Sequence, residues 1–398
     1  MAKYKNIILE VSLLFAATVG AGMFSLPYVF QQSGFVVGVF YLIVLAVIII
    51  SAHYFYFLVL EKTESKKEGL IGLVRTYFGV AGGKLAFLIV AGGLILTLVI
   101  HLILGVGFLG LLFPNKSWGV LVFWLIASLP VFFRLKSLKK TEFLATIFII
   151  ALIVYLAATT EFSFGDYNLL SVNQNNLFLP FGAAFFSLAG WTAIEPIFSK
   201  GKKQKKSEIN PSVFSSGGES GKNDPGKTSV DPAVRRYIWK DGEIKFILAS
   251  GTALAAIFYL VFIMIILNLK NVGPEALSGL SSPQLQVAAF LGLILIFTSY
   301  WPVGLEIKNG LEKDLKWPAF ISDLTVMFSP LVLYFLGLKN FLPLVGLVGG
   351  VFLSLQYFLI MLVVKRVLTL NFWQKALANF SYGVFILGAV YEIFYFFK

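Results

Sequence analysis

The sequence contains no cysteine and only two histidines among its 398 residues. Without cysteine the chain can form no disulfide, no thiolate metal site and no cysteine nucleophile. It also lacks the H-E-x-x-H pattern of zinc hydrolases and the G-x-S-x-G pattern of serine hydrolases. Because neither a nucleophile nor a set of metal ligands can be found, we expect that the protein is not an enzyme and needs no cofactor.

Charge is scarce as well. Only 13% of the residues are Asp, Glu, Lys or Arg, whereas 58% are hydrophobic and 16% are aromatic. The mean hydropathy of +0.86 lies far above the range of soluble domains. The first apolar run is too long for the core of a signal peptide, and no small-residue cleavage pattern follows it. We therefore expect a polytopic membrane protein that retains its first span.

Long apolar runs separated by polar loops predict eleven transmembrane helices, since a helix needs about 20 residues to cross a bilayer. The fold class that follows is an all-α polytopic membrane protein. The expected spans are 7–30, 35–60, 84–112, 118–133, 143–160, 177–198, 244–268, 285–306, 319–337, 341–364 and 374–397.

The basic residues divide unequally between the two sets of loops. If the N-terminus is cytoplasmic, 28 of the 32 Lys and Arg residues lie on the inner side, and 17 against 4 remain when the long loop after span 6 is discounted. Cytoplasmic loops carry such an excess. We therefore take the net charge of +12 as an orientation signal and expect no nucleic-acid partner. The N-terminus should be cytoplasmic and the C-terminus external, in the bilayer of the inner or plasma membrane.

The loop at 200–243 is rich in Ser, Gly, Asn, Pro and Lys and is expected to be largely disordered. Between Gly221 and Thr228 it matches the phosphate-loop pattern G-x-x-x-x-G-K-[ST]. A nucleotide site also requires a buried strand before that loop and a helix after it. Ser-rich sequence stands there instead, so we expect no nucleotide binding.

Small and helix-breaking residues interrupt the first span at 18–27, which reads T-V-G-A-G-M-F-S-L-P. Three small residues followed by Pro27 favour an opened helix. In a bilayer an opened backbone is tolerated only where protein or a water-filled cavity surrounds it. This segment is therefore predicted to line a binding site.

Span 6 contains a comparable interruption at 185–192. Interrupted spans at matching positions in two halves indicate an inverted repeat that binds substrate and ions at the breaks. The alternative is that Gly20, Gly22 and Gly190 only allow helices to pack closely. The inverted repeat would divide the chain into 1–160 (spans 1–5), 161–364 (spans 6–10, including the disordered loop) and 365–398 (span 11).

The run G-A-G-M-F-S-L-P-Y from Gly20 to Tyr28, with Gln31 and Gly34 behind it, resembles the first span of the hydroxy/aromatic amino acid permeases. These belong to the amino acid–polyamine–organocation superfamily. The resemblance implies the five-plus-five inverted-repeat fold of the bacterial leucine transporter, with discontinuous helices 1 and 6 and alternating access. The function that it implies is cation-coupled symport of an aromatic or other neutral amino acid, driven by a sodium or proton gradient.

An amino acid zwitterion needs hydrogen-bond donors for its carboxylate and acceptors for its ammonium group. The opened first span would offer the N–H groups of Ala21, Gly22 and Met23 at the start of its outer half-helix, where the dipole is positive. The sixth span would offer carbonyl groups from 185–189. Trp191 could form a pocket wall or, equally, be an ordinary core aromatic. The substrate-binding candidates are Gly20, Ala21, Gly22, Met23, Phe24, His101, Phe185, Phe186, Ser187, Ala189, Gly190 and Trp191.

Sodium-coupled members of the resembled fold hold the ion between hydroxyls of span 8 and carbonyls of span 1. The residues that match those positions are Thr298, Ser299, Ala16 and Val19, and they imply a sodium site. Some proton-coupled relatives carry a lysine in the middle of span 5. Span 5 has none here, which favours sodium modestly. The alternative for both hydroxyls is that they bond back to their own helix.

Ionisable residues inside a membrane are candidates for function. His101 could contact substrate or relay protons, and the alternative is a neutral histidine bonded between helices. Glu195 could carry a proton or join the two broken helices. Further candidates are Glu10 and Glu306 in cytoplasmic gate pairs with Lys5 or Lys308, His53 near the cytoplasmic end of span 2, and Glu392, which we expect at the membrane interface outside the transport core.

Two other functions on the same fold stay open at this stage. The first is a proton-coupled amino acid permease, and the second is an amino acid sensor that binds without transport. A channel is disfavoured because the sequence contains neither a re-entrant filter nor a ring of repeated pore residues.

Overall fold

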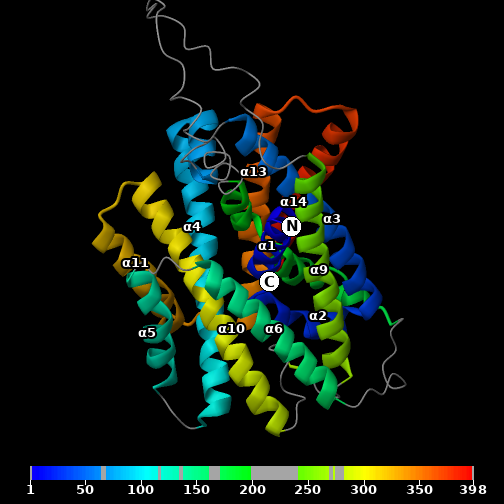
Figure 1. Cartoon of the computed structure of the whole chain (residues 1–398), viewed down its shortest axis with the longest axis vertical. Coiled ribbons are helices and arrows are strands. Elements are labelled where there is room, and N and C mark those ends of the chain that lie inside the picture. Colours follow the sequence, from blue (N-terminus) through cyan, green and yellow to red (C-terminus); the bar gives the residue numbers. More distant parts are fainter. Residues whose placement is uncertain are drawn as a thin grey trace, which may run out of the picture.

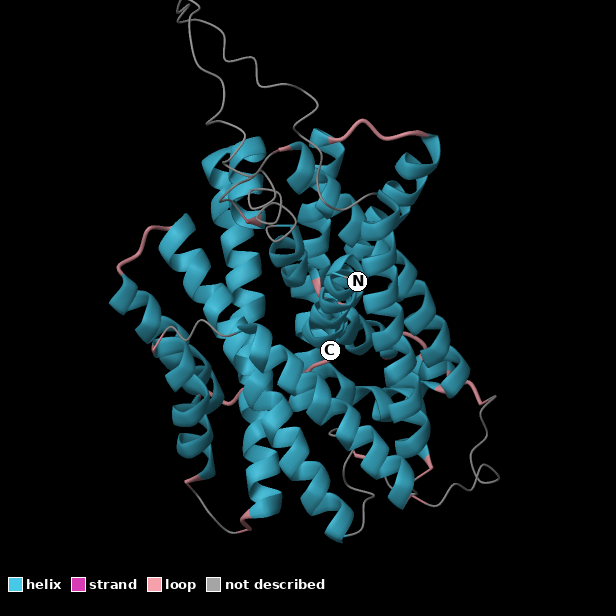
Figure 2. Cartoon of the chain, in the orientation of Figure 1, coloured by secondary structure: helices cyan, strands magenta, loops and turns pink. Residues whose placement is uncertain are grey.

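The computed structural model describes residues 2–63, 69–114, 118–133, 138–160, 171–198, 241–268, 272–273 and 282–396. Figure 2 shows that these described ranges consist of helices joined by loops, without a strand. The phosphate-loop match and most of the loop at 200–243 lie outside the described residues. The last residues of that loop, from Asp241, already belong to the next helix.

Within the described ranges, seven helices are long and apolar enough to cross a membrane, and one bent pair forms an eighth span. Three shorter apolar helices complete the set of eleven segments expected from the sequence, and the polytopic all-α fold class is confirmed. In chain order the elements of the spans are α1 (Ala2–Thr18), η1 (Ala21–Ser25), α2 (Leu26–Ser33), α3 (Phe35–Lys62), α4 (Leu70–Leu112), α5 (Gly119–Phe132), α6 (Leu138–Thr159), α7 (Pro180–Leu188), η3 (Trp191–Ala193), α9 (Asp241–Leu267), α10 (Ser282–Asn309), η6 (Gly310–Asp314), α11 (Ala319–Phe335), α12 (Phe341–Gly346), η7 (Leu347–Leu353), α13 (Ser354–Val367) and α14 (Phe372–Phe396).

The first span is broken where the sequence has its small residues. α1 ends at Thr18, and the axis bends by 50° before the second half, which η1 and α2 form. Gly20 lies at the break with extended torsions, φ −146° and ψ −148°. Pro27 lies in the first turn of α2, where its missing N–H would have no partner in the helix anyway. The predicted opening of span 1 is therefore confirmed.

The sixth span is broken in the same way. α7 ends at Leu188, Ala189 takes an extended conformation with ψ 115°, and the helix resumes after Gly190 as η3. The chain then stays helical to Phe198. Both breaks thus fall in the middle of apolar spans, as the sequence predicts.

The third span begins earlier than the expected 84–112. α4 starts at Leu70 and bends at Gly79, whose φ of 76° lies in the left-handed region that glycine tolerates. The piece before the bend buries Leu70, Leu73 and Val74 and leaves Arg75 exposed. Hydropathy does not reveal this piece, because charged residues surround its short apolar stripe. The stripe packs against other parts of the protein.

Helices distant in the chain pack side by side. α10 lies along α4 and α6, α1 packs on α9, and α7 packs between α3 and η7 (Figure 1). The end of α3, the start of α4 and the connection between α13 and α14 lie at one end of the molecule, the upper end in Figure 1. The two broken spans occupy the interior between these helices.

Glu392 contradicts its expected place at the membrane interface. Only 5% of the side chain is exposed, and it packs against the backbone of Gly182, Gly346 and Gly350. Gly182 in the first turn of α7 also supplies a backbone hydrogen bond to the carboxyl group, and the N-terminus of a helix favours such a partner. α14 is therefore attached to the sixth span, which the charge and position of Glu392 alone could not reveal.

Candidate substrate site at two broken helices

The two breaks touch each other. A Cβ atom on Gly22 would lie 2.5 Å from the Ser187 hydroxyl oxygen and 2.9 Å from the Phe186 ring. On the other side of the crossing, a Cβ atom on Gly190 would lie 2.7 Å from the hydroxyl oxygen of Thr18. Gly22 and Ser187, which are 165 positions apart in the sequence, are therefore in contact, as predicted for a shared site. Glycine at position 22 permits this close approach because it has no side chain.

Opening the first span leaves backbone donors available. The N–H of Val19 makes the last bond to α1, with the Phe15 carbonyl, and the N–H of Met23 bonds to the Gly20 carbonyl at 3.3 Å. Among the described residues the N–H groups of Ala21 and Gly22 have no acceptor. Of the three predicted donors, two are therefore available to a ligand and the third, that of Met23, is already used.

Tyr259 joins both breaks. Its hydroxyl lies 2.8 Å from the Thr18 carbonyl oxygen and 2.7 Å from the Ser187 carbonyl oxygen, so it can donate to either. The side chain is fully buried in α9. The sequence analysis missed this residue, because nothing in the local pattern of α9 distinguishes it from an ordinary core tyrosine.

Span 10 holds the break in span 6. The indole N–H of Trp191 donates to Gln356 Oε1 at 2.8 Å, and the amide of Gln356 donates to the carbonyl of Ile89 in α4. Trp191 is buried and its ring lies 6.2 Å from that of Tyr56. Trp191 is thus both a core aromatic and a wall of the break, and Gln356 is a second partner that the sequence analysis missed.

His53 lies closer to the breaks than its position near the end of span 2 suggested. Its Nε2 is 2.7 Å from the hydroxyl of Tyr357. That hydroxyl in turn meets the backbone of Gly190 and Trp191. His53 is therefore linked to the break through Tyr357.

The aromatic candidates are enclosed in the core. Phe24 packs edge-on against Phe108 and Phe262 at 5.1 and 6.0 Å, while Phe185 stacks on Phe385 at 5.5 Å. The Phe185 carbonyl accepts from the N–H of Ala189. A small cavity of about 20 Å³ remains beside Trp191 and is also lined by Glu306 and Asp314, which is room for about one water.

The two hydroxyls predicted for sodium have different surroundings. Thr298 donates to the Leu295 carbonyl of its own helix at 2.9 Å, as the alternative interpretation of these hydroxyls expected. Ser299 faces the break, since a Cβ atom on Gly20 would lie 3.9 Å from its hydroxyl oxygen. Ala16 and Val19 occupy the last turn of α1 and the start of the break.

His101 is buried, with 3% exposed. Its Nδ1 lies 2.6 Å from the carbonyl of Thr97, and its ring meets Tyr300 at 6.4 Å. Its Nε2 has no hydrogen-bond partner among the described residues. His101 thus packs on Tyr300 of α10, and among the described residues no hydrogen bond or aromatic contact joins its ring to either break.

Glu195 joins the part of span 6 after the break to two other helices. Its carboxylate accepts from the Tyr56 hydroxyl at 2.6 Å and from the Leu70 N–H at 3.3 Å. These bonds do not join the two broken helices as predicted, because Tyr56 lies on α3 and Leu70 on α4; the role in proton transfer stays a prediction.

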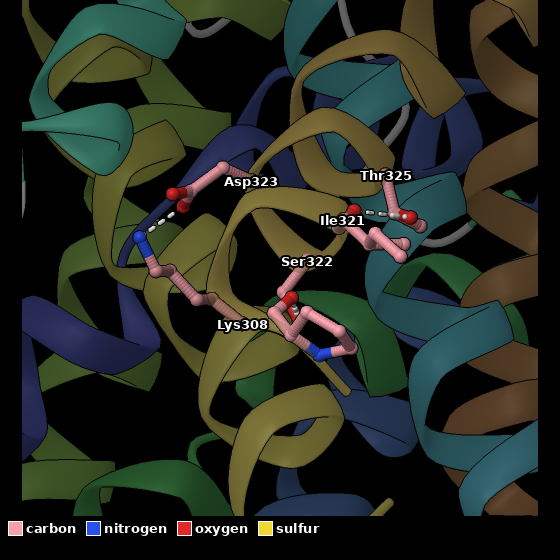
Figure 3. A network of polar contacts seen from close by, with 6 residues as sticks. Lys308, Ile321, Ser322, Asp323 and Thr325 are labelled. Carbon is pink, nitrogen blue, oxygen red and sulfur yellow. Dashed lines mark hydrogen bonds and ion pairs between the residues drawn. The ribbon is translucent and has the colours of Figure 1, made fainter. Parts of the chain in front are cut away.

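The predicted gate pair of Glu306 with Lys308 is wrong. Lys308 donates to Asp323 instead, across the contact between α10 and α11 (Figure 3). Glu306 and Lys308 are two residues apart, about 200° around α10, so Glu306 lines the small cavity while Lys308 reaches Asp323. Glu10 is fully buried in α1, while the side chain of Lys5 lies outside the described part of the chain.

Comparisons with known proteins agree with this geometry. Residues 7–215 match the family described as transmembrane amino acid transporter protein. No curated protein matches the chain by sequence.

Three solved structures illustrate the similarity in fold. MhsT in complex with L-phenylalanine has 14% identity and a TM-score of 0.60, and the match covers 97% of this chain and 98% of that one. The manganese transporter of Eremococcus coleocola has 12% identity and a TM-score of 0.63, with coverage of 99% and 87%. Mhp1, a nucleobase-cation-symport-1 family transporter, has 15% identity and a TM-score of 0.59, with coverage of 97% and 91%. At such identities the similarity establishes the fold of a polytopic transporter.

Proposed function

This chain belongs to the transmembrane amino acid transporter family and is a transport protein rather than an enzyme, and we propose that it imports a neutral amino acid together with a cation. Aromatic and hydroxy amino acids are the proposed substrates, because the motif from Gly20 to Tyr28 resembles permeases for them. MhsT, which shares the fold, was solved with L-phenylalanine. We propose import rather than export because a cation gradient directed into the cell would carry the amino acid inward with the cation.

The observation that carries the proposal is the contact of the two broken spans through Gly22 and Ser187. The N–H groups of Ala21 and Gly22 would bind the substrate carboxylate, helped by the positive end of the outer half-helix. Carbonyl groups at the end of α7 would accept from the ammonium group. In the compact state described here the breaks lie against each other, so substrate entry requires them to separate.

In this proposal, two sets of hydrogen bonds would have to break for the site to open alternately to each side of the membrane. Tyr259 holds the Thr18 and Ser187 carbonyls, and Glu195 holds Tyr56 and the start of α4. Releasing the Glu195 contacts would open the inner side of the break at Trp191. Rocking of spans 1 and 6 against the remaining helices moves the site from one side to the other.

We propose sodium as the coupling ion, bound by Ser299 and by carbonyls of Ala16 and Val19. Thr298 contributes a lone pair while its hydrogen remains on the Leu295 carbonyl. The alternative is proton coupling, for which His101 is the candidate because its buried Nε2 has no hydrogen-bond partner among the described residues.

We also propose an orientation with the N-terminus in the cytoplasm and the C-terminus outside, because the inner loops would then carry the excess of basic residues. The site at the breaks would lie near the middle of the bilayer. Cysteine scanning is simple to interpret in this chain because it has no native cysteine.

Uptake of radiolabelled amino acids by proteoliposomes tests the proposal. We expect saturable accumulation that stops when choline replaces sodium at fixed pH and persists when the pH gradient is collapsed. Accumulation that depends on the pH gradient alone would show that protons rather than sodium are the coupling ion. Binding of an amino acid without any flux would identify a sensor and contradict the transport proposal.

A further inference from the structure

A cavity of about 980 Å³ lies outside the transport site, where the bend of α4 faces the segment that follows α10. One wall is formed by residues on both sides of Gly79, and the other by residues 313–316. Two left-handed residues shape it, since φ is 76° at Gly79 and 57° at Lys316. The cavity is therefore built by the backbone course of two separate elements.

Among the described residues, four basic side chains line this cavity against a single carboxylate. The cations are Arg75, Lys84, Lys313 and Lys316, and the carboxylate is Asp314. All four basic residues are exposed, and Lys313 also interacts electrostatically with Glu195 and Glu306. The cavity thus concentrates positive charge from elements that are more than 200 residues apart in the chain.

The surface beside the cavity is apolar. Val80 is 58% exposed and Phe320 is 65% exposed, and Phe78 and Trp317 are exposed as well. Leu85 and Leu88, further along α4, are exposed as well. An occupant at this place would therefore meet cations in the cavity and hydrocarbon-compatible side chains next to it.

We propose that this cavity binds the phosphate headgroup of an anionic phospholipid, whose acyl chains lie along the exposed apolar residues of α4 and α11. Basic pockets between helices at the cytoplasmic side of a membrane are suited to such headgroups. A soluble anion would use the same cations but would gain nothing from Phe78, Val80, Trp317 and Phe320. The apolar rim is the reason for choosing a lipid.

The position of the lipid connects it with the inner side of the transport site. Ile71 and Asp314 line both this cavity and the small cavity beside Trp191. The next residue before Ile71, Leu70, donates its N–H to Glu195. A headgroup that bridges the two walls would hold the start of α4 against Glu195 and so stabilise the closed inner side.

Binding of phosphatidylglycerol tests the proposal in the full-length protein, with native mass spectrometry and thermal midpoints in phosphatidylcholine-containing micelles as readouts. Wild-type protein should retain phosphatidylglycerol and gain thermal stability from it. The double variant Lys84→Gln/Lys316→Gln should bind it roughly 10- to 30-fold more weakly, because each cation near an anionic surface contributes about fivefold. Lys84→Arg/Lys316→Arg should keep wild-type affinity.

The matched control is Arg366→Gln/Lys375→Gln, which removes the same charge from exposed positions near the connection between α13 and α14, at the same end of the molecule (Figure 1). It should bind phosphatidylglycerol as wild type does. An equal loss in this control would reduce the effect to general surface charge and overturn the proposal. Equal stabilisation by inorganic phosphate would also overturn it, since the site would then take a free anion. Because these readouts involve no amino acid, they are independent of the transport proposal.

Discussion

Gly22 and Ser187 are in such close contact that a Cβ atom at position 22 would lie 2.5 Å from the Ser187 hydroxyl oxygen and 2.9 Å from its Cα. The first of these neighbours could rotate, but the second is backbone. Each broken span therefore covers the opened backbone of the other. The opened backbone meets protein rather than lipid, as a bilayer requires.

Gly22→Ala should abolish amino acid uptake, since the new methyl group would push the two breaks apart and displace the donors at Ala21 and Gly22. We expect at least a 100-fold loss, corresponding to about 3 kcal/mol, with the protein still inserted and monodisperse. Uptake by proteoliposomes measures the effect. Gly107→Ala in α4 is the control, because no atom lies within 4 Å of its added Cβ. Normal uptake by Gly22→Ala would contradict the assignment of the site.

Tyr259→Phe should reduce uptake by roughly 10- to 100-fold, because the Thr18 and Ser187 carbonyls would lose the one hydroxyl proton that they share and a buried group left without its partner costs about 1–3 kcal/mol. The ring itself and its packing are retained. Tyr382→Phe is a suitable control, since its ring contacts with Phe358 and Lys365 do not depend on the hydroxyl. Equal effects of the two substitutions would show that the bridge between the breaks has no special role.

Gln356→Met should leave the indole N–H of Trp191 without its acceptor and loosen the break in span 6. We expect a loss of stability of about 1–3 kcal/mol, seen as a lower thermal midpoint, together with slower uptake. A double-mutant cycle with Trp191→Phe checks the cause. If Gln356 acts through Trp191, the double variant should be little worse than Trp191→Phe alone, whereas strictly additive losses would contradict that link.

Ser299→Ala should raise the sodium concentration for half-maximal uptake by about tenfold, the effect of losing one contact to a charged group worth about 1.5 kcal/mol. Thr298→Ala should have a smaller effect, because its hydroxyl already bonds to Leu295. Sodium titrations of uptake at fixed pH measure both. If neither variant changes the sodium dependence while His101→Gln abolishes uptake driven by a pH gradient, protons are the coupling ion.

Asp323→Asn should destabilise the protein by about 3–5 kcal/mol, since Lys308 would remain charged and buried without its partner. The two side chains are 5% and 11% exposed, so water cannot compensate the loss. Thermal unfolding in detergent measures the difference. Thr325→Ala serves as control, because among the described residues this hydroxyl bonds only to the Ile321 carbonyl of its own helix (Figure 3). Lys308→Met combined with Asp323→Leu should recover most of the stability, and failure to do so would give the pair a role beyond charge compensation.

The spans and their breaks could be predicted from the sequence because both depend on local chemistry. Apolar run length decides whether a helix can cross a bilayer, and Gly20, Gly22, Pro27 and Gly190 weaken helical hydrogen bonding whatever surrounds them. The pairing of segments 1 and 6 also followed from the sequence, since it needed only the position of each break within its half.

What meets those breaks was decided by tertiary structure alone. Tyr259, Gln356 and Tyr357 lie on helices whose local sequence resembles any apolar span, and their roles depend on a hydroxyl or amide reaching a carbonyl or indole from another helix. Burial of Glu392 and the partner of Lys308 were misjudged for the same reason. Hydropathy is a property of neighbouring residues along the chain, whereas a hydrogen bond or ion pair depends on which side of each helix faces which neighbour, and only the packed bundle determines that.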